Sequence, residues 1–260
     1  MNLTSSTSVK SQICAIALLV FVFALGAQDV QAQGFQWPEK SENLKVLPKN
    51  TSAQELSATM RGFTQALGVR CEHCHDDSDG NRLSQMDFAA DTKEAKDIAR
   101  VMLQMVSRIN SEELTKLERT SSAPTLQVTC RTCHRGNKKP EFIEDVLTAE
   151  TIDNGIEDGL ARYHILRERY FGGFTYDFSE RSLLRVAGQL EGEEMVDEAI
   201  AFMELNLEMY PESWQTYGTL AQTYQRMDDN TKALENAEKA LALNPEAGFL
   251  KRLIAELKGE

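Results

Sequence analysis

Two short stretches of the chain place cysteine and histidine at the same spacing. The first pentad is CEHCH, residues 71–75, and the second pentad is CRTCH, residues 130–134. In each pentad, histidine directly follows the second cysteine, although the whole chain has only four histidines. Two thiols at this spacing can bond to the vinyl groups of a porphyrin, and the adjacent imidazole can then reach its iron. The pattern therefore predicts two covalently attached c-type haems.

This prediction gives each pentad residue a role. The thiols that would hold the two porphyrins are those of Cys71, Cys74, Cys130 and Cys133. The proximal iron ligands would be His75 and His134.

Three other uses of the cysteines are less compatible with the sequence. Cysteines of an exported protein are often paired in disulfides, but a chain of 260 residues does not need such links to fold. A four-cysteine zinc site usually has its two pairs about 15–20 residues apart, and these pairs stand much further apart. A redox dithiol would call for a βαβ pattern nearby, and none is visible. The haem hypothesis remains.

A haem iron that is held by histidine needs a second axial ligand, and methionine suits electron transfer. Ahead of the first pentad, apolar residues recur at helical spacing, at Leu56, Met60, Phe63 and Leu67. The spacing predicts a helix that carries Met60 on its apolar stripe. Ser52 with Glu55 predicts a capping box at its start, and Gly68 predicts its end.

A similar stripe precedes the second pentad. Its apolar members are Ala95, Ile98, Met102, Met105 and Ile109. Asp91, with Glu94 three residues later, predicts the N-cap of this second helix. Because Met102 and Met105 share one face, spacing leaves both open as ligands, and methionine on such a stripe can also be core filler.

Two stretches of this sequence resemble the cytochrome c subunit of photosynthetic reaction centres. The first is VLPKNTSAQELSATMRGFTQALGVRCEHCH, and the second is ARVMLQMVSRIN, which is followed by VTCRTCHRG. In that family a helix supplies methionine on one side of each haem, and the following pentad supplies histidine on the other. The resemblance implies Met60 and Met102 as ligands, with Met105 as the fallback. The resemblance covers about residues 46–139. Reaction-centre members of the family carry four haems, whereas this sequence has pentads for two, so it predicts a two-haem relative.

The beginning of the chain predicts export. Lys10 precedes an apolar stretch, residues 13–26, and Val30-Gln31-Ala32 then offers a small-x-small cleavage site. This arrangement is typical of a signal peptide, residues 1–32, and predicts a periplasmic or otherwise exported protein. An uncleaved segment would instead keep the protein membrane-associated. The formal net charge of −12 argues against nucleic acid as a partner.

The second half of the chain has no cysteine and shows an internal repeat. Pro211 and Pro245 stand one tetratricopeptide (TPR) period apart. The copy that ends at Pro245 matches at Tyr217, Leu220, Ala221, Tyr224, Ala233, Ala237 and Ala240. The copy that ends at Pro211 matches less fully, at Leu183, Val186, Ala187, Leu190 and Ala199. Residues 149–170 and 249–257 predict a helix before and a capping helix after the repeats.

Together these patterns predict an all-α protein in four parts. They are a signal peptide (1–32), a dihaem cytochrome c domain (33–140), a connecting helix (141–178) and TPR-like repeats with a capping helix (179–260). The predicted function is electron transfer between redox partner proteins, membrane-bound ones included, which the repeats would dock. The alternatives are a peroxidase-like dihaem enzyme with one exchangeable ligand and a haem-based redox sensor. Repeats that only complete the fold are a further alternative.

Overall fold

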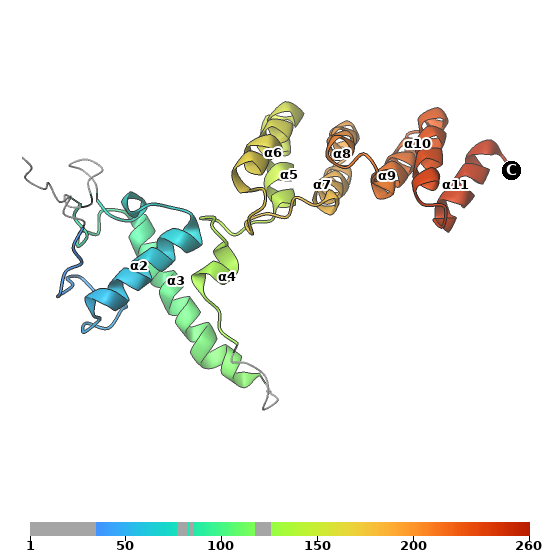
Figure 1. The fold of residues 1–260 in the computed structure, drawn as a ribbon. Helices are drawn as coiled ribbons and strands as arrows, with labels where there is room; N and C mark the ends of the chain where they lie inside the picture. The colour runs from blue at the N-terminus through green and yellow to red at the C-terminus, as the bar shows by residue number, and fades with distance from the viewer. Residues whose placement is uncertain (1–34, 77–82, 84–85, 118–125) are drawn as a thin grey trace, which may run out of the picture.

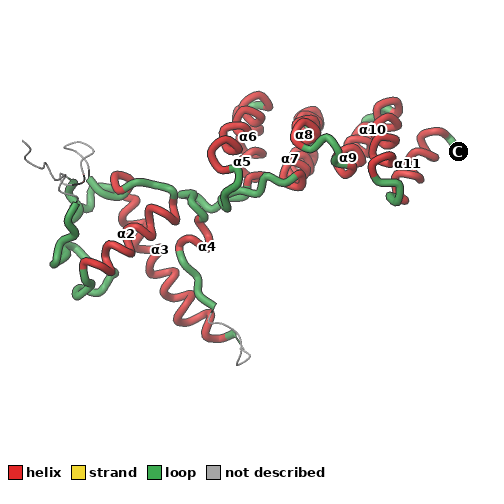
Figure 2. The backbone as a smooth tube through the Cα atoms, viewed as in Figure 1, coloured by secondary structure: helices red, strands yellow, loops and turns green. Residues whose placement is uncertain are grey.

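The computed structural model describes residues 35–76, 83, 86–117 and 126–260. Helices and turns make up the regular structure of these residues, and Figure 2 shows no strand among them. The all-α prediction is therefore confirmed for the part of the chain described. The predicted signal peptide lies outside these residues. Within them, no helix combines the length and apolar character that crossing a bilayer requires.

Among the described residues, three α-helices accompany the two pentads. They are α2 (Ala53–Leu67), α3 (Glu94–Arg108) and α4 (Cys130–His134), and a short 3-10 turn covers Cys71–His73. Helix α2 begins as its sequence predicts: the Glu55 amide donates to the Ser52 hydroxyl, and the Ser52 amide donates to the Glu55 carboxylate. It ends at Gly68, whose φ of 64° is left-handed. Both predicted ends of α2 are confirmed.

Helix α3 begins differently from the prediction. Its N-cap residue is Lys93, which makes no side-chain cap, and Asp91 lies two residues earlier. The Asp91 carboxylate is instead engaged by Lys45 and Arg100. The predicted N-cap role of Asp91 is therefore wrong. Charge-assisted bonds to two cations are stronger than one bond to a helix amide, and they hold this carboxylate away from the cap position.

Seven further helices follow in the second half of the chain. They are α5 (Ile143–Asn154), α6 (Ile156–Tyr170), α7 (Glu180–Gly192), α8 (Val196–Met209), α9 (Trp214–Arg226), α10 (Asn230–Leu243) and α11 (Gly248–Lys258). The single helix predicted for residues 149–170 is wrong, because Gly155, with φ 95°, separates α5 from α6. Gly159 then allows close packing of the pair, since a Cβ there would lie 2.1 Å from Thr151 Oγ1.

The helices α5 to α11 form a row that leads away from α2, α3 and α4 (Figure 1). One buried apolar cluster runs from Ile143 to Ala233 and so joins α5 and α6 to the helices that follow. The period-34 positions lie inside this row. Leu183, Val186, Ala187, Leu190 and Ala199 are buried in α7 and α8, and Leu220, Ala221, Tyr224, Ala233, Ala237 and Ala240 are buried in α9 and α10. Tyr217 is half-buried, and the prolines at the ends of the two copies are exposed, whereas the other periodic residues form the core of the row.

Candidate haem sites

The first pentad lies on one tight turn. The His75 amide donates to the Cys71 carbonyl at 3.0 Å, so the two cysteines and the histidine share a single loop of chain. Cys71, Cys74, Cys130 and Cys133 are all free thiols. Burial raises the pKa of the Cys74 thiol, against an opposing effect of Lys93, so this thiol is protonated at neutral pH.

One cavity collects the residues that the sequence predicts for the first haem. It has a volume of about 610 Å³, and Met60, Cys71, Cys74 and His75 all line it. Met60 reaches it from α2, whereas the other three reach it from the pentad. Four residues predicted from two separate patterns therefore meet in one place.

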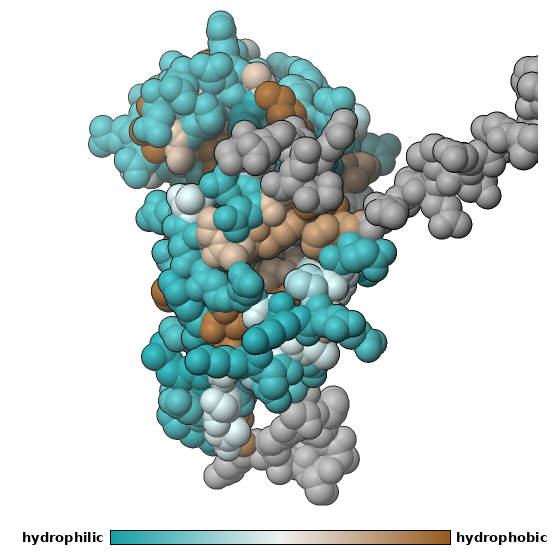
Figure 3. Space-filling model, turned by 90° about the vertical axis from the view of Figure 1, so that its left-hand side faces the viewer, coloured by the Kyte–Doolittle hydropathy of each residue, from teal (hydrophilic) through white to brown (hydrophobic). Residues whose placement is uncertain are grey.

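The character of this cavity fits a macrocycle. Cofactor pockets usually measure roughly 300–1,000 Å³ and are mostly apolar. This one has an apolar lining that comes from four parts of the chain, for example Trp37, Phe63, Phe88 and Leu103. Figure 3, which looks onto the end of the molecule that carries α2 and α3, shows apolar residues gathered at the centre of that face. The residues present therefore fit a bound porphyrin.

The His75 imidazole is prepared for metal binding. Its ring packs edge-on against Phe88, with ring centroids 4.9 Å apart. Burial lowers the pKa of the imidazole, and the positive charge of Lys96 lowers it further. The ring is therefore neutral at physiological pH and has a nitrogen lone pair that a metal can accept.

Sequence reasoning missed two groups of residues at this cavity. Met86 lines it and is only 8% exposed, so it is a second thioether beside Met60. Residues between Phe35 and Leu47 also line it, although their sequence shows no helical or strand periodicity. Phe35 and Trp37, whose rings pack edge-to-face with centroids 5.3 Å apart, are the feature of this segment that could have indicated a place at the cavity.

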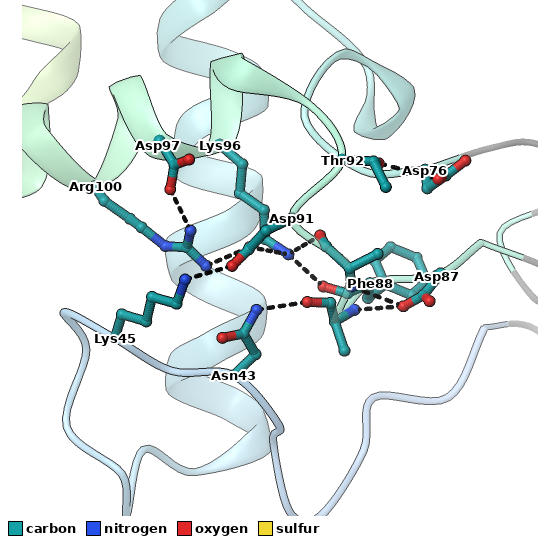
Figure 4. Close-up of polar contacts among 12 residues, drawn as sticks. Asn43, Lys45, Asp76, Asp87, Phe88, Asp91, Thr92, Lys96, Asp97 and Arg100 are labelled. Atoms are coloured by element: carbon teal, nitrogen blue, oxygen red, sulfur yellow. Dashed lines mark hydrogen bonds and ion pairs between the residues drawn. The ribbon is translucent and has the colours of Figure 1, made fainter.

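A network centred on Asp91 ties this irregular segment to α3 (Figure 4). Asp91 accepts hydrogen bonds from Lys45 at 2.5 Å and Arg100 at 2.7 Å, and Lys96 lies 3.4 Å away. The Arg100 guanidinium and then the Lys45 ammonium hold the pKa of this carboxyl well below its usual range. All three cations also line the cavity. The network therefore fixes positive charge at the cavity wall.

The second pentad forms the short helix α4. Thr129 and Thr132 form a capping box at its start, in which the Thr129 backbone amide donates to the Thr132 hydroxyl at 3.0 Å. His134 Nδ1 lies 3.0 Å from the Asn137 carbonyl oxygen. A carbonyl can only accept, so Nδ1 carries a proton, and Nε2 has the lone pair in the tautomer that this contact selects.

The methionines of the second helix lie on an open face. Met102 and Met105 are each 36% exposed, and neighbouring Ile98 and Val101 are more exposed still. Neither methionine lines the open hollow beside the second pentad, whereas Met60 lines the cavity at the first pentad. An apolar helix face of this kind normally has a partner, and a bound macrocycle would cover it.

Asn110 ties this helix to the second pentad. Its side chain donates to the Val128 carbonyl and accepts from the Val128 amide, both at 2.8 Å. Val128 lies two residues before Cys130, so the end of the methionine-bearing helix is held close to the predicted attachment site.

The chain has relatives among c-type cytochromes. Residues 23–155 match the family model of the photosynthetic reaction centre cytochrome c subunit. Cytochrome c-554 of Chloroflexus aurantiacus is 34% identical over 46% of this chain, and the photosynthetic reaction center cytochrome c subunit of Rubrivivax gelatinosus is 31% identical over 39%. The matched segments span about a quarter of these two relatives, 25% and 24%.

The family match extends over half of the chain, from residue 23 through both pentads to the end of α5. Cytochromes c of this family carry electrons on covalently bound haem. The chain therefore belongs to the photosynthetic reaction centre cytochrome c subunit family.

Proposed function

We propose that this protein is an exported dihaem c-type cytochrome that carries electrons between redox partner proteins and catalyses no reaction of its own. The convergence of Met60, Cys71, Cys74 and His75 on one apolar cavity carries this proposal. When bound, each haem supplies an iron that alternates between Fe(II) and Fe(III).

At the first site, Cys71 and Cys74 would hold the porphyrin through thioether bonds, and His75 would be the proximal ligand. Met60 would be the second axial ligand, because it belongs to a regular helix with well-defined ends that also lines the cavity. Met86 is the competing thioether. Two strong ligands keep the iron closed to small molecules, which suits electron transfer.

At the second site, Cys130 and Cys133 would hold the porphyrin, and His134 would be the proximal ligand. The family resemblance favours Met102 as the second axial ligand, with Met105 as its fallback. The exposure of both methionines also supports one alternative, a peroxidase-like enzyme whose second haem exchanges a weak ligand for substrate.

Positive charge surrounds both sites. Lys45, Lys96 and Arg100 line the first cavity, and Arg131 and Arg135 line an open hollow beside the second pentad. Haem propionates are anionic, and guanidinium groups match carboxylates in geometry. These side chains would therefore hold the propionates.

The helix row would serve as a TPR-like docking domain that begins near Pro140. Buried residues at the period-34 positions support this assignment. Two repeats alone are usually too few for stability, and α5 with α6 would act as a third helix pair because they share the buried cluster.

Replacement of the two cavity methionines, one at a time, tests the electron-transfer proposal. Met60→Leu should abolish the methionine–iron absorption band of one haem and lower its midpoint potential by on the order of 100 mV, a fraction of the ~0.8 V range that axial ligands span. Met86→Leu, the matched control, should leave both unchanged. Ready binding of carbon monoxide by the unaltered protein would favour the enzyme instead.

A further inference from the structure

A chain of hydrogen bonds connects the predicted second haem ligand to the helix row. His134 Nδ1 donates to the Asn137 carbonyl at 3.0 Å, and the Asn137 side-chain amide donates to the Tyr176 hydroxyl at 2.6 Å. The Asn137 backbone amide also donates to the His134 carbonyl at 2.8 Å, so two hydrogen bonds join His134 and Asn137 across the turn. Tyr176 therefore holds the residue that orients His134.

Tyr176 is itself fixed by the core of the helix row. It is 8% exposed and belongs to the buried cluster that includes Tyr163 and Phe178. Its ring packs edge-on against Tyr170 and Phe178, with centroids 5.3 and 6.3 Å away. The position of its hydroxyl is therefore set by the packing of the helices.

A second contact makes the same connection. The Thr175 hydroxyl donates to the Arg135 carbonyl at 2.7 Å, and a Cβ atom at Gly136 would lie 3.3 Å from that hydroxyl oxygen. The loop after α6 therefore lies directly against the turn after the second pentad, and a Cβ atom at Gly136 would require the Thr175 hydroxyl to move by a few tenths of an ångström.

The first pentad offers an internal comparison. His75 Nδ1 is buried without a hydrogen bond of normal geometry to the described residues, although its interaction with the Phe88 backbone raises the pKa of the imidazole. The contacts described here connect the second predicted proximal ligand, and not the first, to the helix row.

We propose that Tyr176 is a positioning residue for His134, through which the packing of the helix row sets the redox equilibrium of the second haem. This inference rests on the proposed dihaem function. A hydrogen bond from Nδ1–H to a carbonyl fixes the orientation of the imidazole and makes its other nitrogen a stronger donor. An imidazole that donates more strongly stabilises Fe(III). The intact chain of hydrogen bonds from Tyr176 through Asn137 to His134, here called the relay, therefore keeps the midpoint potential of the second haem low.

Tyr176→Phe in the full haem-loaded protein tests this relay. Loss of the hydroxyl releases Asn137 while the ring keeps its contacts, so the potential of one haem should rise. The ratio of Fe(II) to Fe(III) at a fixed potential should increase roughly two- to thirtyfold, the range by which residues in such networks change a coupled equilibrium. Tyr170→Phe, the control, removes a neighbouring hydroxyl outside the relay and should move neither potential.

A second variant separates positioning from simple support of the fold. Asn137→Ala should shift the same haem in the same direction, and the double variant should shift it no further, because both changes break one chain. A structural role alone would lower the thermal midpoint of unfolding without moving either potential, and that result would overturn the inference. Equal shifts of both haems would also overturn it.

Failure of the proposed function is distinguishable in the same experiment. If the unaltered protein shows no c-type haem spectrum, both proposals fall. If it shows two haems and Tyr176→Phe leaves both potentials unchanged, the electron-transfer proposal stands and the relay is refuted.

Discussion

Gly68 and Gly136 meet so closely that a Cβ atom at Gly68 would lie 2.2 Å from the Gly136 carbonyl oxygen. The Gly136 amide also donates to the Ala66 carbonyl at 2.8 Å. Gly68 lies three residues before Cys71, and Gly136 two residues after His134. The end of α2 and the turn after α4 therefore meet through backbone contact, which joins the segments that flank the two pentads.

Gly68→Ala should therefore loosen the contact between the end of α2 and the turn after α4. The substitution places a side chain at φ 64° and against a carbonyl, so we expect the free energy of unfolding to fall by ~1–3 kcal/mol. Chemical denaturation followed by circular dichroism would measure the loss. Gly62→Ala in the same helix is the control, because nothing lies within 4 Å of its Cβ position and helical alanine should stabilise by ~0.5–1 kcal/mol. An unchanged stability for Gly68→Ala would contradict the close contact.

Asp91→Asn should destabilise the protein at neutral pH. Its cationic partners lower the pKa of the carboxyl in the folded state, so its stabilisation is complete above the unfolded pKa of about 3.9 and is lost as the pH falls below it. The difference in unfolding free energy between the unaltered protein and Asp91→Asn should therefore shrink as the pH falls from neutral to strongly acidic values. Urea unfolding across that range measures this difference. Asp97→Asn, whose side chain is 64% exposed, should cost less at every pH; an equal cost would refute the central role of Asp91.

The two exposed methionines of α3 should differ in a redox titration. Met102→Leu should lower the midpoint potential of the second haem, because loss of the thioether ligand destabilises Fe(II). Met105→Leu, with the same exposure in the structure, is its matched control and should change little. The reverse outcome would show that Met105 is the ligand.

Local signals explain why α2 could be predicted so closely from the sequence. The Ser52–Glu55 cap and the left-handed Gly68 involve residues that are neighbours in the chain. The same holds for the apolar stripe that carries Met60 to the cavity.

Features that depend on distant residues could not be predicted. Asp91 pairs with Lys45, 46 positions earlier, so no local pattern reveals why it leaves the N-cap of α3. Met86 and the segment from Phe35 to Leu47 meet the cavity only after the chain folds. The break at Gly155 was hidden because a lone glycine is also tolerated inside a helix.

Asn206 should connect consecutive helix pairs in the row. It is fully buried in α8, and its amide donates to the Glu180 carbonyl at 3.0 Å and to the Thr216 hydroxyl at 2.7 Å. Asn206→Ala should lower the free energy of unfolding by about 1–3 kcal/mol, because buried partners lose their hydrogen bonds. Thermal unfolding of the full chain checks this. Asn236→Ala is the control, because the Asn236 side chain donates to the Lys232 carbonyl within its own helix. Equal losses in the two variants would argue against a linking role for Asn206.

Intact-mass spectrometry of the protein, made in a host that attaches c-type haem, shows whether both pentads hold a haem. We expect the polypeptide mass plus two haems, reduced to one haem when Cys130 and Cys133 are both replaced by alanine. A polypeptide without added haem, with its thiols free, joined to each other or holding zinc, would contradict this expectation.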